Sequence, residues 1–185
     1  MSGQVIAEIK ELLVTDEPAG LGPKSRAGVL SESVLNAKLN SLFSEARLSP
    51  PQQELIRSVL LLWHDHLAAS HNISQSIENA DGSFVHAIMH RREPDYWNAK
   101  YWWRRVGAHP AFPEIARRVG ELLKQSGAGE LATKLLPGGK WDACAFVDAC
   151  EVAADASERE ALLREIQRIE CEVLLECFMS GGKGA

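Results

Sequence analysis

Apolar residues recur at steps of three and four along most of this chain, and this spacing constrains the fold more than any other feature. Such steps return to one face of an α-helix, whereas a half-buried strand needs strict alternation of apolar and polar residues. No stretch combines that alternation with enrichment in β-branched residues. The sequence therefore predicts an all-α fold, a single-domain irregular helical bundle of about seven or eight helices.

Capping residues, glycines and prolines separate the predicted helices. The longest apolar series begins with a capping box at Ser49 and Gln52, and it predicts one continuous helix as far as Glu78. A short turn is expected at residues 131–136. The predicted helices cover residues 4–14, 31–46, 50–78, 84–92, 96–106, 113–126 and 142–154, and a last helix begins with a second capping box at Ser157 and Glu160.

Length and local composition predict one folded domain with loose ends. The chain has 185 residues, of which 45% are hydrophobic, enough for one domain with a buried core. Residues 1–30 are expected to form an N-terminal helix followed by a flexible linker rich in proline and glycine. Residues 31–180 are expected to form the helical domain, and residues 181–185 a disordered tail.

Charge, hydropathy and cysteine spacing exclude several classes of protein. The formal net charge of -5 argues against a general nucleic-acid binder, and no apolar run is long enough to span a membrane. The first residues lack the basic start and apolar block of a signal peptide. The four cysteines form two pairs spaced by six residues, which points the thiols of each pair in different directions on a helix. We therefore expect a cytoplasmic protein with buried, reduced cysteines.

The residue types that carry chemistry are concentrated in one stretch of the chain. All six histidines, four of the five tryptophans and both tyrosines lie between Trp63 and His109. Imidazoles bind metals and move protons, while aromatic rings and arginines hold ligands. The sequence therefore predicts a small-molecule site within residues 63–110.

The histidine spacing predicts a metal site in this stretch. His86 and His90 are four residues apart, so their rings lie on one face of a helix and can bind a single ion. If the preceding helix packs alongside, His64 or His71 supplies a third nitrogen. The expected ion is zinc, iron, nickel or manganese, with an open position for a water of lowered pKa. The alternative for each histidine is a structural or supporting role.

Three further residues are candidates for catalysis. Glu78 or Glu93 could act as an oxygen ligand or a base, and His109 could shuttle protons from a loop. The chain contains neither H-E-x-x-H nor E-x-x-H, so it matches neither the gluzincin proteases nor the carboxylate-bridged di-iron bundles.

Cations and aromatic residues follow the histidine pair and form a second candidate group. Arginine can grip a carboxylate or phosphate while an aromatic face stacks on a ring or sugar. The alternative is a buried ion-pair network with nearby acids. The balanced charges in this stretch argue against nucleic-acid binding. The expected ligand-binding residues are Arg91, Arg92, Tyr96, Trp97, Lys100, Tyr101, Arg104 and Arg105.

The block HAIMHRREPDYWNAKYWWRRVGAHP, residues 86–110, resembles a block in a family of uncharacterised microbial proteins. The resemblance covers roughly 50 residues around the block. The family has no assigned activity, so the resemblance implies no catalytic roles.

Three functions remain open from the sequence. The leading hypothesis is a metal-dependent hydrolase or transferase acting on a small polar or anionic substrate. A second is a non-catalytic module that binds an anion or a sugar. A third is a structural protein whose aromatic helix forms a homodimer interface rich in tryptophan, tyrosine and arginine. The feature that distinguishes them is whether imidazoles from two helices converge at a solvent-accessible site.

Overall fold

A computed structural model of the chain describes residues 3–153 and 158–181, and within these ranges it contains ten α-helices and no strand. The all-α prediction is confirmed, whereas seven or eight helices is too low a number. A 3₁₀ turn at Pro137–Gly139 follows the eighth helix. In chain order the helices are α1 (Gly3–Glu11), α2 (Glu32–Glu45), α3 (Pro50–Trp63), α4 (Leu67–Ser74), α5 (Ala80–Arg92), α6 (Tyr96–Val106), α7 (Phe112–Gln125), α8 (Gly129–Leu135), α9 (Ala143–Glu151) and α10 (Glu158–Ser180).

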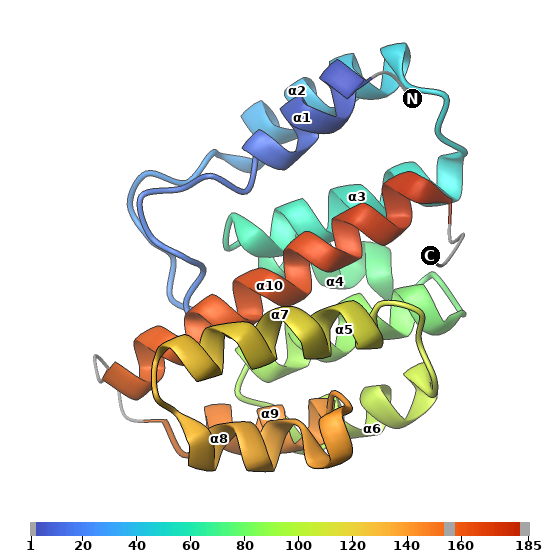
Figure 1. The fold of residues 1–185 in the computed structure, drawn as a ribbon. Coiled ribbons are helices and arrows are strands. Elements are labelled where there is room, and N and C mark those ends of the chain that lie inside the picture. The colour runs from blue at the N-terminus through green and yellow to red at the C-terminus, as the bar shows by residue number, and fades with distance from the viewer. Residues whose placement is uncertain (1–2, 154–157, 182–185) are drawn as a thin grey trace.

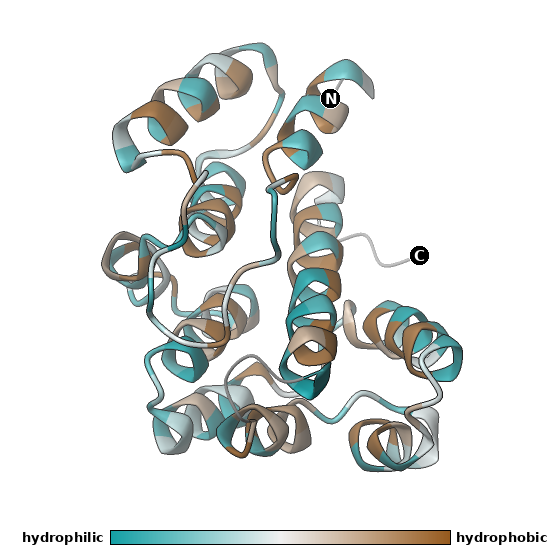
Figure 2. Ribbon diagram, turned by 90° about the vertical axis from the view of Figure 1, so that its left-hand side faces the viewer, coloured by the Kyte–Doolittle hydropathy of each residue, from teal (hydrophilic) through white to brown (hydrophobic). Residues whose placement is uncertain are grey.

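The helices are arranged with α1 and α2 at one end and α6, α8 and α9 at the other (Figure 1). Between these ends lie α3, α4, α5 and α7, together with the long helix α10. Brown apolar and teal polar residues alternate around most helices in Figure 2, as expected where each helix buries one face. No helix in the described part of the chain is long and apolar enough to cross a membrane.

The predicted helix over residues 50–78 is wrong, because it breaks between α3 and α4. Asp65 has a φ of +67°, and a Schellman-type end closes α3: the Asp65 N–H donates to Leu62 at 3.2 Å and the His66 N–H to Leu61 at 2.9 Å. Aspartate tolerates this left-handed conformation better than most residues. The apolar spacing continues across the break, so periodicity alone does not reveal it.

The predicted turn at residues 131–136 is also wrong, because α8 occupies most of it. Leu131 and Leu135 lie one helical turn apart and are both buried, so this short helix is fixed by packing. The expected tail falls almost entirely on residues outside the described ranges, and so does Ser157, the first residue of the second capping box.

Helix α5 runs through the interior and is buried at every residue from Gly82 to Arg92. The Asn79 side chain caps its start by accepting the Gly82 N–H at 2.8 Å. A Cβ at Gly82 would lie 2.1 Å from the carbonyl oxygen of Ile77, so only glycine fits this first turn. The close approach fixes how α5 leaves the turn after α4, and both helices carry candidate ligands.

Residues 12–30, which we call the N-terminal arm, run along the side of the bundle from α1 to α2 (Figure 1). The flexibility predicted for this stretch stays a prediction; hydrogen bonds connect the arm to the core. The Gln167 amide donates to the carbonyls of Ala19 and Gly20 at 3.0 and 3.1 Å. Polar side chains of the core thus position the arm, and the composition of the arm does not show that they bind it.

The four cysteines are free thiols, as expected for reduced residues. Cys150 and Cys171 are buried, and burial raises the pKa of each to about 12. Cys144 and Cys177 are only half-buried, so the prediction of buried thiols holds for two of the four. At such a pKa the two buried thiols stay protonated and unreactive.

Candidate metal centre

Three imidazoles from two neighbouring helices converge at one place. One nitrogen of His71, on α4, lies within 4.8 Å of a nitrogen of His86 and of His90, both on α5. The ring centroids of His86 and His90 are 4.7 Å apart, and that of His71 lies 4.7 and 5.3 Å from them. We call these residues the histidine triad. Three of the four histidines expected as ligands therefore lie together. Of the two histidines considered for the third nitrogen, His64 and His71, it is His71 that lies beside the pair.

The local sequence explains this convergence. His86 and His90 are one helical turn apart, and their rings stack at an interplanar angle of 23°. The short turn after α4 brings that helix back against α5, so His71 meets the pair edge-on. The break at Asp65 reorients α4 relative to α3, which separates His71 from His64.

The triad fits a transition-metal ion after a small contraction. In a tetrahedral site with metal–nitrogen bonds of 2.0–2.1 Å, the nitrogens lie about 3.3 Å apart. The triad nitrogens are separated by at most 4.8 Å. His71 is the half-buried member, so its side chain has the most freedom to move toward His86 and His90.

His86 is held in a form ready to bind a metal. It is only 3% exposed, its ring stacks on Trp102 of α6 at 4.0 Å, and its Nδ1 has no hydrogen-bond partner within the described part of the chain. Burial, followed by the neighbouring His90 and His71 rings, lowers the pKa of His86 to about 3. The imidazole therefore stays neutral near neutral pH, and its lone pair remains available to an ion.

His90 has the surroundings of a supported ligand. Its Nδ1 lies 3.3 Å from the Glu93 carboxylate and 4.0 Å from Asp95, and the Asn98 amide lies 3.1 Å from its Nε2. Burial lowers the pKa of His90, while the Glu93 charge opposes that shift. The Glu93 carboxylate on Nδ1 fixes the orientation of the ring, and Nε2 is the nitrogen that would bind a metal in place of the Asn98 amide. Glu93 thus lies at the site, beside a candidate ligand.

Two residues at the site, Asn98 and Trp102, are absent from the sequence-based candidates. They are four residues apart on α6, which repeats the spacing of His86 and His90 on α5. A turn of three residues joins these two helices, so the two pairs face each other. This repeated spacing is the sequence signal that could have identified Asn98 and Trp102 as part of the site.

The other residues expected at the metal site or in catalysis lie elsewhere. His64 donates from Nε2 to the Leu12 carbonyl at 2.8 Å and accepts the Leu30 N–H on Nδ1 at 3.1 Å, so it anchors the N-terminal arm. His109 pairs with Asp81 at 2.9 Å, and Glu78 is exposed in the turn between α4 and α5. None of the three belongs to the triad.

Arg91 and Arg92 are in buried ion pairs, an arrangement that favours the ion-pair alternative for these two residues. Arg91 donates to Glu170 at 2.6 Å, and neither side chain has exposed surface. Arg92 donates to Asp65 at 2.7 Å, and both side chains are 1% exposed. Glu170 lies on α10 and Asp65 lies at the break between α3 and α4, so both acids come from other parts of the chain than the helix that carries the arginines.

The remaining candidates lie on α6, mostly on its outer side. Lys100 pairs with Asp148 of α9, and Tyr96 is half-buried against the core. The other four are exposed and form one continuous strip, which we call the aromatic–arginine face. It consists of Trp97, Tyr101, Arg104 and Arg105.

Folding stability is expected to fall as the pH drops below His64's usual pKa of 6.5. Burial, opposed by the hydrogen bond to Leu12, lowers the pKa of His64. Above pH 6.5 the neutral ring lets the fold keep its full stability. Below pH 6.5 the unfolded chain binds a proton before the folded chain does, which lowers the free energy of unfolding by up to about 1.4 kcal/mol per pH unit. Urea unfolding at about pH 7.5 and about pH 5.5 measures this decline. His64→Gln should show a smaller decline than the wild type, and equal declines would exclude His64 as a source.

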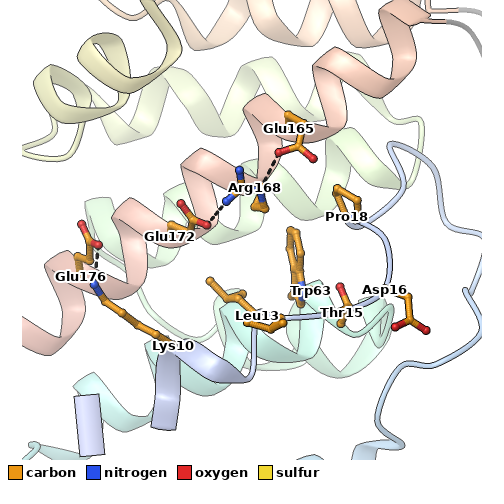
Figure 3. A pocket seen from close by; sticks show the side chains of 11 residues that line it. Lys10, Leu13, Thr15, Asp16, Pro18, Trp63, Glu165, Arg168, Glu172 and Glu176 are labelled. Atoms are coloured by element: carbon orange, nitrogen blue, oxygen red, sulfur yellow. Dashed lines mark hydrogen bonds and ion pairs between the residues drawn. The ribbon is translucent and has the colours of Figure 1, made fainter. Parts of the chain in front are cut away.

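A separate pocket of about 540 Å³ lies between the N-terminal arm and α10 (Figure 3). Trp63 lines it, and three of its four acids are already neutralised: Glu176 pairs with Lys10 at 2.7 Å, and Arg168 bridges Glu165 and Glu172. Among the described residues that line the pocket, Asp16 is the one acid without an ion pair, and no histidine accompanies it. The triad is therefore the stronger candidate site.

No protein-family model, curated protein or solved structure is found to match this chain. The resemblance of residues 86–110 to a microbial family stays a prediction. The function must be argued from the geometry of the triad and its surroundings.

Proposed function

We propose that this protein binds one divalent transition-metal ion at the histidine triad and is a metal-dependent hydrolase or transferase acting on a small polar or anionic substrate. The observation that carries the proposal is the convergence of three imidazole nitrogens within 4.8 Å. A buried imidazole nitrogen with no partner in the described chain supports it, because such a group is costly unless a ligand satisfies it.

The donor set favours zinc, with iron or nickel as alternatives. Three imidazole ligands suit these ions, whereas manganese prefers oxygen ligands. A bound zinc with three protein ligands keeps an open position, where it lowers the pKa of a water and polarises a substrate oxygen. Glu93 is the residue placed to help: its side chain is 37% exposed and already supports His90, so its carboxylate can also meet a water at the entrance.

Elemental analysis of the protein purified without a histidine tag tests the metal. We expect about one zinc, iron or nickel per chain, or uptake of one equivalent of zinc by the metal-free protein. His71→Ala should lose this uptake because it removes a triad ligand from the half-buried edge of the site. His66→Ala is the matched control, since His66 bonds to the Leu30 carbonyl at 2.8 Å and lies outside the triad.

Two outcomes would contradict the proposal. Zinc, iron, nickel and manganese all far below one equivalent, before and after incubation with excess metal, would remove the metal centre. Equal uptake by His71→Ala and His66→Ala would place the ion elsewhere. The catalytic part is tested with p-nitrophenyl phosphate and p-nitrophenyl acetate; hydrolysis should require metal and should disappear in His71→Ala.

A further inference from the structure

We propose that the aromatic–arginine face of α6 recognises the substrate of this metal centre, and that the substrate is a small anion carrying an aromatic or sugar ring. This inference rests on the proposed function, because the face is assigned to the same site. It adds the substrate class, which the triad alone does not specify.

The two aromatic rings of the face are exposed where a protein normally hides such groups. Trp97 is 74% exposed and Tyr101 is 40% exposed. Their ring planes lie within 12° of parallel, with centroids 6.4 Å apart. Exposed, nearly parallel rings offer aromatic faces on which a ligand ring can stack.

The two arginines of the face carry charge that no acid neutralises. Within the described residues neither Arg104 nor Arg105 has an ion pair or a hydrogen bond, although the chain has a net charge of -5. The Arg105 guanidinium lies 5.2 Å from the Trp102 ring and 6.0 Å from the Tyr101 ring, so cation–π contacts hold it. Its N–H donors remain free for a carboxylate or a phosphate.

The face is continuous with the metal centre. Asn98, Trp102 and Arg105 follow one another at steps of four and three, so they share one side of α6, and Tyr101 lies beside them. The Trp102 ring is 4.0 Å from the His86 ring and 5.2 Å from Arg105. These two separations limit the distance from the His86 ring to the Arg105 guanidinium to about 9 Å. A single small ligand can span that distance.

The ligand class follows from these three observations. Free guanidinium groups select an anion, the parallel rings select a planar or sugar ring, and the short span limits the size. The anion would meet Arg105 and the ring would lie against Trp97 and Tyr101, leaving a further polar group to reach the metal.

Calorimetric titration with four probes tests the class. Phenyl phosphate and glucose 6-phosphate distinguish an aromatic ring from a sugar ring, while inorganic phosphate lacks the ring and phenol lacks the charge. We expect at least one ring-bearing phosphate to bind roughly 10-fold more tightly than inorganic phosphate and phenol. Arg105→Ala should weaken that binding by at least about 10-fold. Trp97→Ala should make the ring-bearing phosphate bind only as tightly as inorganic phosphate, without abolishing phosphate binding.

The matched control is Arg47→Ala, because Arg47 is an exposed arginine outside the face. Equal affinities in Arg105→Ala and Arg47→Ala would overturn the inference. So would a concentration-dependent dimer that dissociates in Trp97→Ala, or an oligonucleotide that binds more tightly than every small probe.

Metal content measured on the same samples separates the two proposals. If zinc binds at the triad but Arg105→Ala changes nothing, the face fails and the metal centre stands. If no metal binds, yet a ring-bearing phosphate still requires Arg105 and Trp97, the metal centre fails and the ligand class stands.

Discussion

His86→Phe is expected to stabilise the metal-free protein while abolishing its metal binding. The substitution keeps an aromatic ring stacked on Trp102 and removes a buried nitrogen that lacks a partner in the described chain. Removing an unsatisfied buried polar atom should raise the free energy of unfolding by about 1 to 2 kcal/mol. The same change deletes a proposed metal ligand. Loss of a residue that only hydrogen-bonds to a ligand lowers metal affinity by roughly 10- to 100-fold, so we expect loss of the ligand itself to lower it by at least about 100-fold.

The matched control for this prediction is His109→Phe. His109 is also buried, but its Nε2 pairs with Asp81 at 2.9 Å and its Nδ1 accepts the Ala111 N–H at 3.1 Å. Phenylalanine leaves that buried N–H without a partner, so His109→Phe should lose about 1 to 3 kcal/mol and retain full metal affinity. Urea unfolding of the metal-free proteins and zinc titration measure both quantities.

Opposite signs in these two variants would distinguish a functional histidine from a structural one. A binding site often retains a group that costs stability because the ligand needs it. If both variants lose stability to the same extent and neither changes zinc affinity, His86 is a structural residue and the triad is not a metal site.

Local patterns account for the parts of the fold and site that sequence predicted well. The predicted helix at residues 96–106 has the bounds of α6, because Asp95 caps its start and Gly107 ends it with a positive φ. The adjacency of His86 and His90 is likewise local, since a helix places residues four apart on one face. Such features need no knowledge of the rest of the chain.

The features of the fold and the site that could not be predicted from the sequence depend on contacts between residues far apart in the chain. The helix break at Asp65 depends on Arg26 and Arg92, which are 39 and 27 residues away. Arg91 is likewise buried because Glu170, 79 residues away, meets it in the core. In the sequence Arg91, Arg92 and Arg105 are equivalent cations, and only packing separates the buried pairs from the exposed donor.

Asp65→Asn is expected to lower the free energy of unfolding by about 3 to 5 kcal/mol. The Asp65 carboxylate accepts hydrogen bonds from Arg92 at 2.7 Å and from Arg26 at 2.9 Å, and its side chain is 1% exposed. Burial alone would raise the pKa of Asp65, but the two guanidinium groups lower it, so the carboxylate is charged near neutral pH. Asparagine removes that charge and leaves Arg92 buried without a counter-ion.

The choice of asparagine isolates the charge from the backbone, because asparagine also tolerates the positive φ at this position. Glu54→Gln is the control for loss of a surface ion pair: Glu54 is 47% exposed and pairs with Arg57 at 3.3 Å, so its loss should stay within about 0.5 kcal/mol. The double variant Asp65→Asn with Arg92→Met should recover part of the loss, since an apolar side chain then replaces the unpaired cation. Urea unfolding measures all three, and a loss below about 1 kcal/mol in Asp65→Asn would mean that the ion pair does not hold α3, α5 and the N-terminal arm together.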